Sequence, residues 1–304
     1  MAHDYTAMRP RWVSAATDMA ELASAGTDFW KLYRHDIFRP IMNPATKNNR
    51  PTDIKSRLRR FRRKRFKRMG KGILKLAGTV IYRQSLISTE PVMDKSVFPW
   101  IAGFENNWEC IRAELDEVLK TRDQLPCFHE VSRDQKNVSL GDNWKVFALY
   151  VLGKQFAPNC ALCPETTRLL EQVPNIRNAM FSILSPRYHI PPHQGPTNAL
   201  VRIHLALKVP QDSTNCKIRV GEEFFTWKEG ECTVFDDFYD HEVWNDTDEY
   251  RAVLFFDVDR PLKPLGRLLS RLAIAGLRNS AYIKDAEKNL RDWARKTGTV
   301  SDAG

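Results

Sequence analysis

The sequence lacks long hydrophobic runs and is poor in cysteine. No stretch of about 18 consecutive apolar residues occurs, so there is no candidate for a membrane-spanning helix. The opening residues, MAHDYTAMRPRW, do not show the basic and then apolar pattern of a secretory signal. Six cysteines in 304 residues exclude a disulfide scaffold and favour a reducing compartment. We therefore expect a soluble or peripheral cytoplasmic protein.

Cys160 and Cys163 have the CxxC spacing of a zinc ligand pair. A structural zinc site needs four ligands, and no second Cys or His pair follows at a suitable distance. We expect buried or half-buried thiols at these positions.

The sequence is rich in aromatic residues and in basic charge. Hydrophobic residues make up 42% of the chain, with 8 Trp and 16 Phe, which is enough to fill a globular core. The net charge is +10, but twelve basic residues lie in the segment 55–75, and without them the chain would be slightly acidic. The basic character is therefore local.

The polybasic segment has the pattern of an amphipathic helix. Apolar residues recur at intervals of three and four along it, namely Ile54, Leu58, Phe61, Phe66, Met69 and Ile73. Such a helix suits an anionic membrane surface, which we expect on the inner face of the membrane. A solvated tethering helix is an alternative, and nucleic acid is the least favoured partner.

Four regions follow one another along the chain. They are an irregular lead-in (1–53), the polybasic segment (54–76), a β-rich domain with N-terminal supporting helices (95–262) and a basic helical tail (263–304). Within the domain the spacing of apolar residues predicts a helix with an asparagine cap over 105–120. Another helix is expected to begin at Pro164 and to end before Pro174.

Short runs of β-favouring residues separated by turns dominate the second half of the domain. The expected strands are 179–184, 199–209, 217–220, 222–227, 232–235, 241–245 and 250–258. Many short strands at this spacing predict a β-rich α+β fold with an antiparallel sandwich or jelly roll.

Two histidines lie at the ends of expected strands. His193 follows a Pro-Pro turn, and His241 begins another expected strand. Two imidazoles can hold one metal ion, and a facial iron site adds a carboxylate two residues after the first histidine. That position is Gly195. From spacing alone, a metal site and two hydrogen-bonded histidines in turns both stay open.

Two arginines favour a buried site. Strand residues alternate between faces, so Arg251 is expected to face the same way as Val253 and Phe255. Arg202 and His204 share one face of their strand for the same reason. Since a buried guanidinium needs an anionic partner, these residues predict an anion-binding interior.

The runs FSILSPRYHIPPHQGPTNALVRIHLAL and CKIRVGEEFFTWKEGECTVFDDFYDHEVWNDTDEYRAVLFFDVDRPL carry a resemblance to a known family. Residues 144–262 resemble the aspartyl/asparaginyl β-hydroxylase family of iron(II) and 2-oxoglutarate-dependent dioxygenases. This resemblance implies a double-stranded β-helix core, also called jelly-roll or cupin-like, with the amphipathic helices at its flanks. It also implies that dioxygen and 2-oxoglutarate are consumed and that succinate and carbon dioxide are released as a C–H bond is hydroxylated.

The resemblance assigns roles to individual residues. His193 and His241 resemble the two iron ligands, and Gly195 matches a glycine that the aspartyl hydroxylases of this family also have. Arg251 and Ser182 resemble the pair that binds the far carboxylate of 2-oxoglutarate.

Arg202 and His204 resemble residues that line the co-substrate and substrate side of the site. A core histidine bonded to backbone is the alternative for His204. Asp237 and Trp244 also match the motif and are as suited to shaping the turn before His241 as to touching a ligand. The other histidines have no partner pattern and are expected to be ordinary, namely His3, His35, His129 and His189.

The substrate is expected to be an acyl chain of a membrane lipid, of the lipid A or ornithine lipid type. In aspartyl hydroxylases the strand after the first ligand carries two arginines, whereas this chain has Leu200 in place of the first, which suits an acyl chain. Lipid A hydroxylases usually begin with a membrane-spanning segment and keep a carboxylate two residues after the first iron ligand. This sequence shows neither feature, which argues against lipid A as the substrate. The alternatives are β-hydroxylation of peptidyl aspartate, asparagine or a small molecule, and a non-catalytic nucleic-acid or membrane-binding protein.

Overall fold

The computed structural model describes residues 78–131 and 138–278. The predicted lead-in 1–53 and polybasic segment 54–76 lie outside the described residues, as does the tail beyond residue 278. The proposed domain bounds therefore stay predictions.

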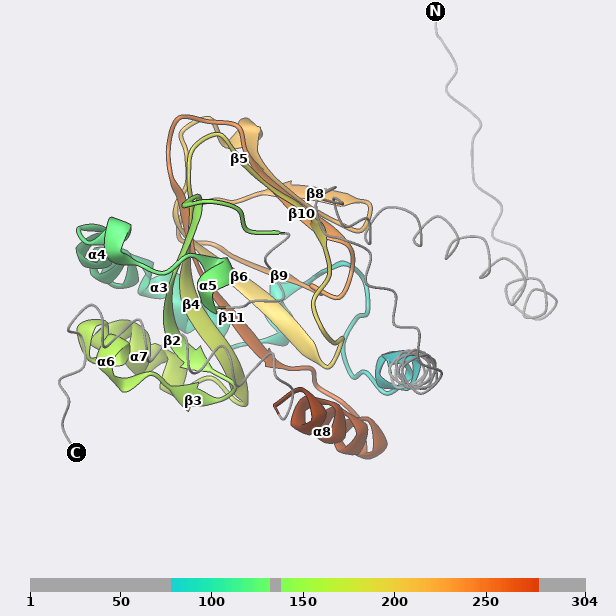
Figure 1. The fold of residues 1–304 in the computed structure, drawn as a ribbon. Helices are drawn as coiled ribbons and strands as arrows, with labels where there is room; N and C mark the ends of the chain where they lie inside the picture. The colour runs from blue at the N-terminus through green and yellow to red at the C-terminus, as the bar shows by residue number, and fades with distance from the viewer. Residues whose placement is uncertain (1–77, 132–137, 279–304) are drawn as a thin grey trace, which may run out of the picture. The chain divides into compact units, whose positions relative to one another are not determined.

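Two antiparallel sheets form the described part of the chain (Figure 1). The larger sheet has the strand order β1-β9-β6-β11-β4-β2-β3. Its strands, in chain order, are β1 (Val92–Met93), β2 (Trp144–Val151), β3 (Lys154–Gln155), β4 (Ile176–Leu184), β6 (Leu200–Lys208), β9 (Cys232–Phe235) and β11 (Arg251–Asp259).

The smaller sheet has the order β5-β10-β7-β8. Its strands are β5 (Tyr188–His193), β7 (Cys216–Val220), β8 (Glu223–Thr226) and β10 (His241–Asn245). Two facing antiparallel sheets whose strands cross repeatedly between them form a jelly roll, as the sequence predicted.

The faces of the larger sheet separate two cores. In β11, Val253 and Phe255 belong to the core between the two sheets. Leu254 and Phe256 belong to the core on the opposite face. The alternation predicted for the strand of Arg251 is therefore confirmed, and Arg251 lies on the face that looks toward the smaller sheet.

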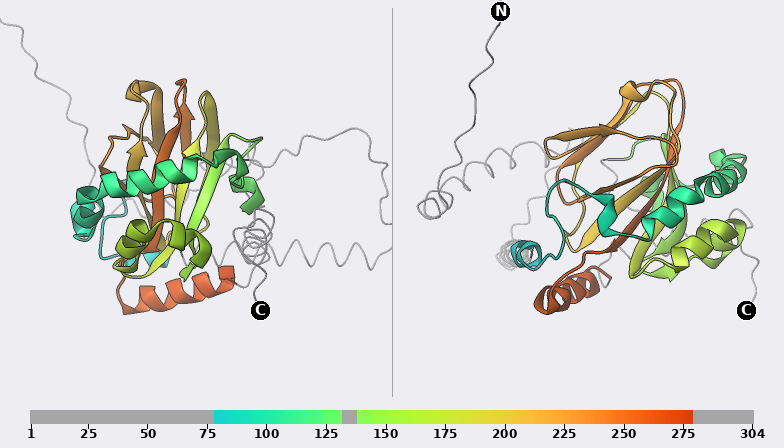
Figure 2. Two further views of the ribbon diagram at one scale, coloured as in Figure 1. Left: turned by 90° about the vertical axis from the view of Figure 1, so that its left-hand side faces the viewer. Right: turned by 180° about the vertical axis from the view of Figure 1, so that it is seen from behind.

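Helices cover the outer face of the larger sheet (Figures 1 and 2). They are α3 (Ile101–Asn106), α4 (Trp108–Leu119), α6 (Ala157–Leu162) and α7 (Pro164–Glu171), while the short α5 (Phe128–Val131) contacts β2. Ile111, Leu115 and Val118 of α4 are buried at spacings of four and three, as the sequence predicted. The α7 helix begins at Pro164, also as predicted.

The helix predicted over 105–120 is divided at Asn107. No side-chain cap bond forms there, because the amide of Asn107 donates to the Gly103 carbonyl of the preceding turn at 2.7 Å. Asn107 is thus the N-cap residue of α4, as an asparagine cap was predicted, but its side chain makes no capping hydrogen bond.

A last helix, α8 (Pro264–Arg278), follows β11. Ile274 from α8 packs with Ile81, Ala199 and Leu262, and Leu200 lies against this small cluster. Among the described residues, no helix is long and apolar enough to cross a membrane.

Candidate active site

His193 and His241 lie side by side between the sheets. They are direct partners in the β5–β10 pairing, and their ring centroids are 4.1 Å apart. Antiparallel pairing thus brings together two imidazoles that are far apart in the sequence. The structure confirms that the two rings are close enough to share one ion.

Both rings are held in one tautomer by the backbone. The Nδ1 of His193 is 2.9 Å from the Pro191 carbonyl oxygen, and the Nδ1 of His241 is 2.9 Å from that of Tyr239. A carbonyl oxygen only accepts, so each Nδ1 carries the proton and donates it. Each Nε2 therefore keeps its lone pair, as a metal-binding imidazole requires.

Burial keeps both imidazoles neutral. It lowers the pKa of His193 to about 4, with a smaller effect from the cation of Arg202. The pKa of His241 lies well below its usual range, first because of burial and then because of the neighbouring His193. Two neutral nitrogen donors are thus available at physiological pH.

The space beside Gly195 is filled by the carboxylate of Asp237. A Cβ at position 195 would lie 2.5 Å from the Asp237 Oδ1, and the Gly195 amide donates to the Asp237 carbonyl at 2.7 Å. No side chain fits there. The Asp237 carboxylate, from the turn before β10, therefore occupies the place where a side chain at position 195 would begin.

Arg202 is engaged by two carboxylates. Its Nε donates to Asp257 Oδ1 at 2.8 Å and its Nη2 to Asp257 Oδ2 at 3.1 Å. The same guanidinium is 3.1 Å from Asp237 Oδ2. Burial raises the pKa of Asp237 above its usual range, and Arg202 opposes that rise. The arginine thus holds the Asp237 carboxylate beside the histidines.

Arg251 is buried without such a partner. Its side chain is 1% exposed, and its Nε and Nη1 have no hydrogen-bond partner among the described residues. Its guanidinium lies 4.6 Å from the centroid of the Trp227 ring. Burial lowers the pKa of Arg251 to about 10, so it stays charged at neutral pH. An unpaired buried cation of this kind suits an anionic ligand.

Ser182 and His204 face the same interior. Ser182 accepts a hydrogen bond from the Trp144 indole at 2.9 Å and lies two residues from Leu184, the strand partner of Arg251. His204 is buried, and its Nδ1 has no partner in the described part of the chain. A backbone hydrogen bond could involve only the other ring nitrogen, so both interpretations of His204 stay predictions.

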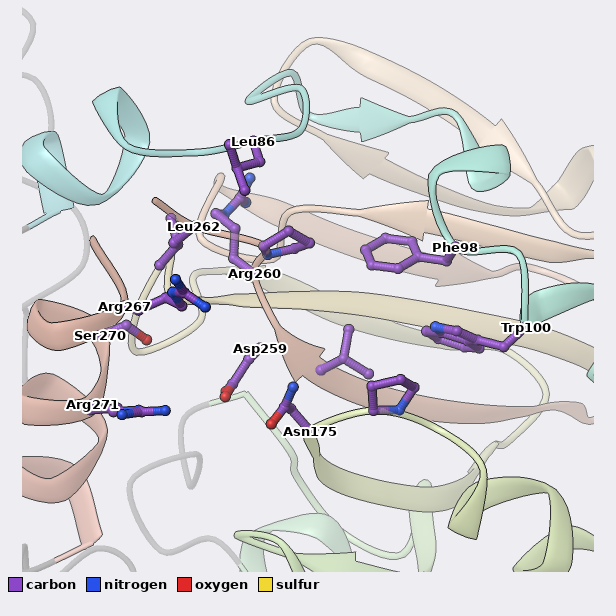
Figure 3. A pocket seen from close by; sticks show the side chains of 13 residues that line it. Leu86, Phe98, Trp100, Asn175, Asp259, Arg260, Leu262, Arg267, Ser270 and Arg271 are labelled. Atoms are coloured by element: carbon purple, nitrogen blue, oxygen red, sulfur yellow. The ribbon is translucent and has the colours of Figure 1, made fainter. Parts of the chain in front are cut away.

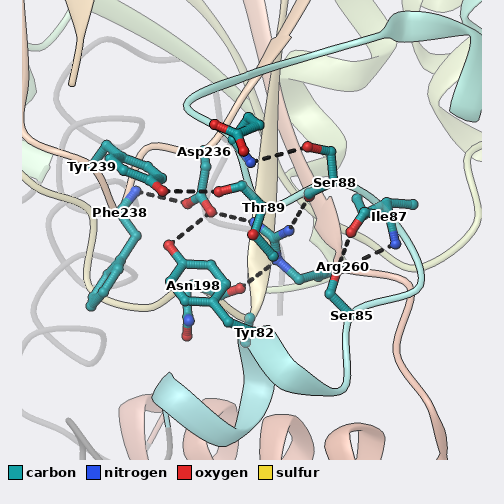
Figure 4. Close-up of polar contacts among 12 residues, drawn as sticks. Tyr82, Ser85, Ile87, Ser88, Thr89, Asn198, Asp236, Phe238, Tyr239 and Arg260 are labelled. Carbon is teal, nitrogen blue, oxygen red and sulfur yellow. Dashed lines mark hydrogen bonds and ion pairs between the residues drawn. The ribbon is translucent and has the colours of Figure 1, made fainter. Parts of the chain in front are cut away.

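A buried polar network fixes the turn that carries Asp237 and His241 (Figure 4). Asp236 pairs with Arg260 at the end of β11 and accepts from the Tyr82 hydroxyl at 3.0 Å. Arg260 also donates to the carbonyls of Asn198 at 2.8 Å and Ser88 at 3.1 Å. Residues from three distant segments thus hold this turn in place.

Other predicted residues lie away from the site. Trp244 stacks on His189 at 5.1 Å and under Lys217, on the outer side of the smaller sheet. His129 and His189 make local contacts with Ser139 and Glu242, as expected of ordinary histidines. Cys160 and Cys163 are free, buried thiols. Leu200 shares the inner face with Arg202 but packs toward α8.

Sequence reasoning missed the aromatic residues that support the site and the bond from Arg202 to Asp257. Trp227 and Trp144 contact Arg251 and Ser182, and no spacing signal marks them. Strand alternation places Asp257 on the same face as Phe255 and Arg251, and this was the one sequence signal that Asp257 faces the site. Its anchoring of Arg202 appears only when β6 and β11 pair.

The donor set fits a metal ion held by two histidines together with an organic anion. No group of three or more His, Cys, Asp or Glu side chains within residues 78–131 and 138–278 is arranged to hold a metal ion. The Nε2 lone pairs of His193 and His241 are left over by the backbone contacts of the Nδ1 atoms, and Arg251 supplies a buried positive charge without a carboxylate partner among the described residues. The interior can therefore bind a cation and an anion together.

The profile of the family described as Aspartyl/Asparaginyl beta-hydroxylase matches residues 105–261. An ornithine lipid ester-linked acyl 2-hydroxylase from Rhizobium tropici is 36% identical over 231 residues, covering 76% of this chain and 82% of that protein. The human aspartyl/asparaginyl beta-hydroxylase is 36% identical over 166 residues, covering 53% of this chain and 21% of that protein.

Among solved structures, the chain is similar to an oxidoreductase of the 2OG-Fe(II) oxygenase family from Burkholderia pseudomallei. The alignment covers 39% of this chain and 67% of that protein. Its sequence identity is 14% and its TM-score 0.29. The jelly-roll assignment rests on the two sheets described above. The extent of the profile match and the identity to the Rhizobium protein show that this chain belongs to the aspartyl/asparaginyl β-hydroxylase family.

Proposed function

We propose that the protein is an iron(II) and 2-oxoglutarate-dependent hydroxylase that acts on an acyl chain of a membrane lipid of the ornithine lipid type. Two observations carry the chemistry. The imidazoles of His193 and His241 are adjacent, with their Nδ1 atoms donating to the backbone, and the guanidinium of Arg251 is buried with its Nε and Nη1 unpaired among the described residues. A chelating dicarboxylate would meet both features at once.

His193 and His241 would hold iron(II) through their Nε2 atoms, because their Nδ1 atoms already donate to the backbone. Arg251 and Ser182 would bind the far carboxylate of 2-oxoglutarate through charge-assisted and hydroxyl hydrogen bonds. Arg202 holds Asp237 in the space that a side chain at position 195 would otherwise fill. Bound iron would supply the oxidation of a C–H bond by dioxygen as 2-oxoglutarate becomes succinate and carbon dioxide.

The lipid substrate is supported by how much of each chain is aligned with a lipid hydroxylase. The Rhizobium acyl 2-hydroxylase matches most of both chains, whereas the human protein matches about half of this chain and a fifth of its own length.

The test is a comparison of lipids from cells that synthesise ornithine lipids, with and without expression of this chain. Mass spectrometry should find ornithine lipid that is heavier by one oxygen, located on an ester-linked acyl chain. The His241→Ala variant is the matched control and should give none. If the protein is soluble and turns over 2-oxoglutarate but the ornithine lipid is unchanged, the ornithine lipid assignment is wrong. Lipid A that is heavier by one oxygen would instead identify lipid A as the substrate.

Hydroxylation of peptidyl aspartate or asparagine is a second candidate, favoured by the match to the human protein. The two candidates separate in one assay with purified protein, iron(II), 2-oxoglutarate and dioxygen. Ornithine lipid in mixed micelles should stimulate succinate formation, and Asp-containing peptides should not. The opposite pattern would establish the peptide substrate.

A further inference from the structure

The α8 helix carries leucines on the face opposite to its buried side. Gly266, Ser270 and Ile274 recur every four residues and are buried. The exposed leucines of α8 are Leu265, Leu268 and Leu272, with exposed fractions of 54%, 56% and 62%. At about 100° per residue these leucines form one stripe on the opposite side of the helix. We call them the leucine stripe.

The α8 helix is also cationic. Its sequence, PLGRLLSRLAIAGLR, has no acidic residue. Arg267 and Arg271, one turn apart, lie on the flank of the leucine stripe and are exposed. No carboxylate in the described part of the chain pairs with either side chain. An apolar stripe with a cationic flank complements an anionic bilayer, which offers an apolar layer beneath phosphate groups.

A pocket adjoins this helix on its arginine side. Figure 3 shows Arg267 and Arg271 extending from α8 toward a cavity of about 430 Å³, with Phe98 and Trp100 on its far side. Its one carboxylate, Asp259, is held by Arg177 through bonds of 2.7 and 2.6 Å. The positive charge at the pocket is therefore left available to an anion.

The stripe is held in a fixed position relative to the barrel. Gly266 lies so close to Gln84 that a Cβ would come within 2.6 Å of the Gln84 Cβ. Ile274 packs into the cluster against which Leu200 lies. Leu200 begins β6, whose inner face leads on to Arg202. The helix thus lies at the Leu200 end of the larger sheet.

We propose that the leucine stripe docks the protein on an anionic membrane, with Arg267 and Arg271 binding lipid phosphates at the adjoining pocket. This inference rests on the proposed function for its choice of partner, and it deepens that function. Docking in this orientation turns the Leu200 end of the barrel toward the lipid from which an acyl chain must come.

The experiment is flotation of the full-length chain with vesicles of phosphatidylcholine and phosphatidylglycerol. It is done in about 1 M salt, where the Debye length is about 3 Å, so that the segment 55–75 contributes little. The double variant Leu268→Glu, Leu272→Glu should bind at least about tenfold more weakly, because two half-exposed leucines no longer enter the apolar layer. The matched control Leu140→Glu, Leu162→Glu changes two similarly exposed leucines elsewhere and should stay within about twofold.

The arginines are tested at low salt. The double variant Arg267→Gln, Arg271→Gln should lose about fivefold in binding per arginine on anionic vesicles, and nothing on phosphatidylcholine alone. Amide hydrogen exchange of residues 264–275 should slow when anionic vesicles are added. That readout reports on α8 itself and is independent of other basic segments.

Several results would overturn the docking surface. The first is equal vesicle binding by the variant Leu268→Glu, Leu272→Glu and the control Leu140→Glu, Leu162→Glu. A loss of self-association in that variant with unchanged vesicle binding would assign the stripe to a second copy of this chain. Exchange of residues 264–275 that does not change when anionic vesicles are added would also rule out docking through α8.

Failure of the docking surface is distinguishable from failure of the proposed function. Uncoupled succinate formation from 2-oxoglutarate is measured on the same proteins without vesicles, and the leucine variants should retain it. Vesicle binding without succinate formation in the unsubstituted chain would overturn the hydroxylase and leave the docking surface standing.

Discussion

The carboxylate of Asp237 occupies the space into which any side chain at position 195 would extend, with 2.5 Å between the Asp237 Oδ1 and a Cβ built on Gly195. The glycine and the aspartate are therefore a coupled pair. Arg202 holds the Asp237 carboxylate in this place, with 3.1 Å between the Arg202 Nη2 and the Asp237 Oδ2.

This coupling predicts a non-additive mutational effect. Gly195→Ala should lower the free energy of unfolding by about 1–3 kcal/mol, because the new methyl group overlaps the Asp237 side chain. Adding Asp237→Ala should recover part of that loss. A double-mutant cycle by denaturant unfolding measures the coupling. Strict additivity of the two substitutions would show that the two side chains do not compete for space.

Arg251 should be needed for co-substrate binding and not for folding. We expect Arg251→Met to raise the 2-oxoglutarate concentration required for turnover by at least about 30-fold, equivalent to about 2 kcal/mol or more. The free energy of unfolding should be unchanged or higher, because a buried unpaired cation is removed. Thermal unfolding and succinate assays check both effects.

The control for Arg251 is Arg187→Met. Arg187 forms an exposed bidentate pair with Asp248, and its removal should change stability by less than about 1 kcal/mol. A normal 2-oxoglutarate requirement in Arg251→Met, or a stability loss of several kcal/mol, would assign Arg251 to structure.

The histidine tautomers are directly measurable. In metal-free protein at neutral pH, nitrogen-15 NMR should show protonated Nδ1 and unprotonated Nε2 in both His193 and His241, because each Nδ1 donates to a carbonyl. Protein from which bound iron(II) has been removed should show the same two tautomers. A proton on either Nε2 would show that the ring is not preset for metal binding.

The cysteines should differ sharply in reactivity. Cys110 is exposed, whereas the other five are buried, and burial raises the pKa of Cys127 and Cys216 to about 11. A raised pKa keeps a thiol protonated and unreactive at neutral pH. Titration with a thiol reagent should therefore find one fast thiol, and five more only after unfolding. Release of zinc during unfolding would revive a metal role for Cys160 and Cys163.

The strand pattern was largely predictable, and its gaps have physical causes. The strands 232–235 and 241–245 were predicted with their observed bounds, because apolar alternation and flanking turns mark them. The β5 strand was missed because Pro191 and Pro192 read as a turn. As an edge strand of the smaller sheet, β5 tolerates residues without an amide donor. The β2 strand was missed because its continuous apolar run does not distinguish strand from helix.

The site was predictable in its residue types and less so in its pairings. Alternation placed Arg251 and His204 on an inner face, and the family resemblance paired His193 with His241. The capture of Arg202 by Asp237 and Asp257 could not be foreseen, because it depends on the register of β6 against β11 and on a distant turn. The role of Arg202 in contacting co-substrate stays a prediction.

The iron site is tested most sharply by anaerobic titration of the purified protein with iron(II) in the presence of 2-oxoglutarate. The unsubstituted chain should bind one iron(II) per molecule and form succinate when oxygen is admitted. His193→Ala and His241→Ala should each lose both properties while keeping a cooperative unfolding transition. Full iron binding and succinate formation by either folded variant would show that these two imidazoles do not form the reactive centre.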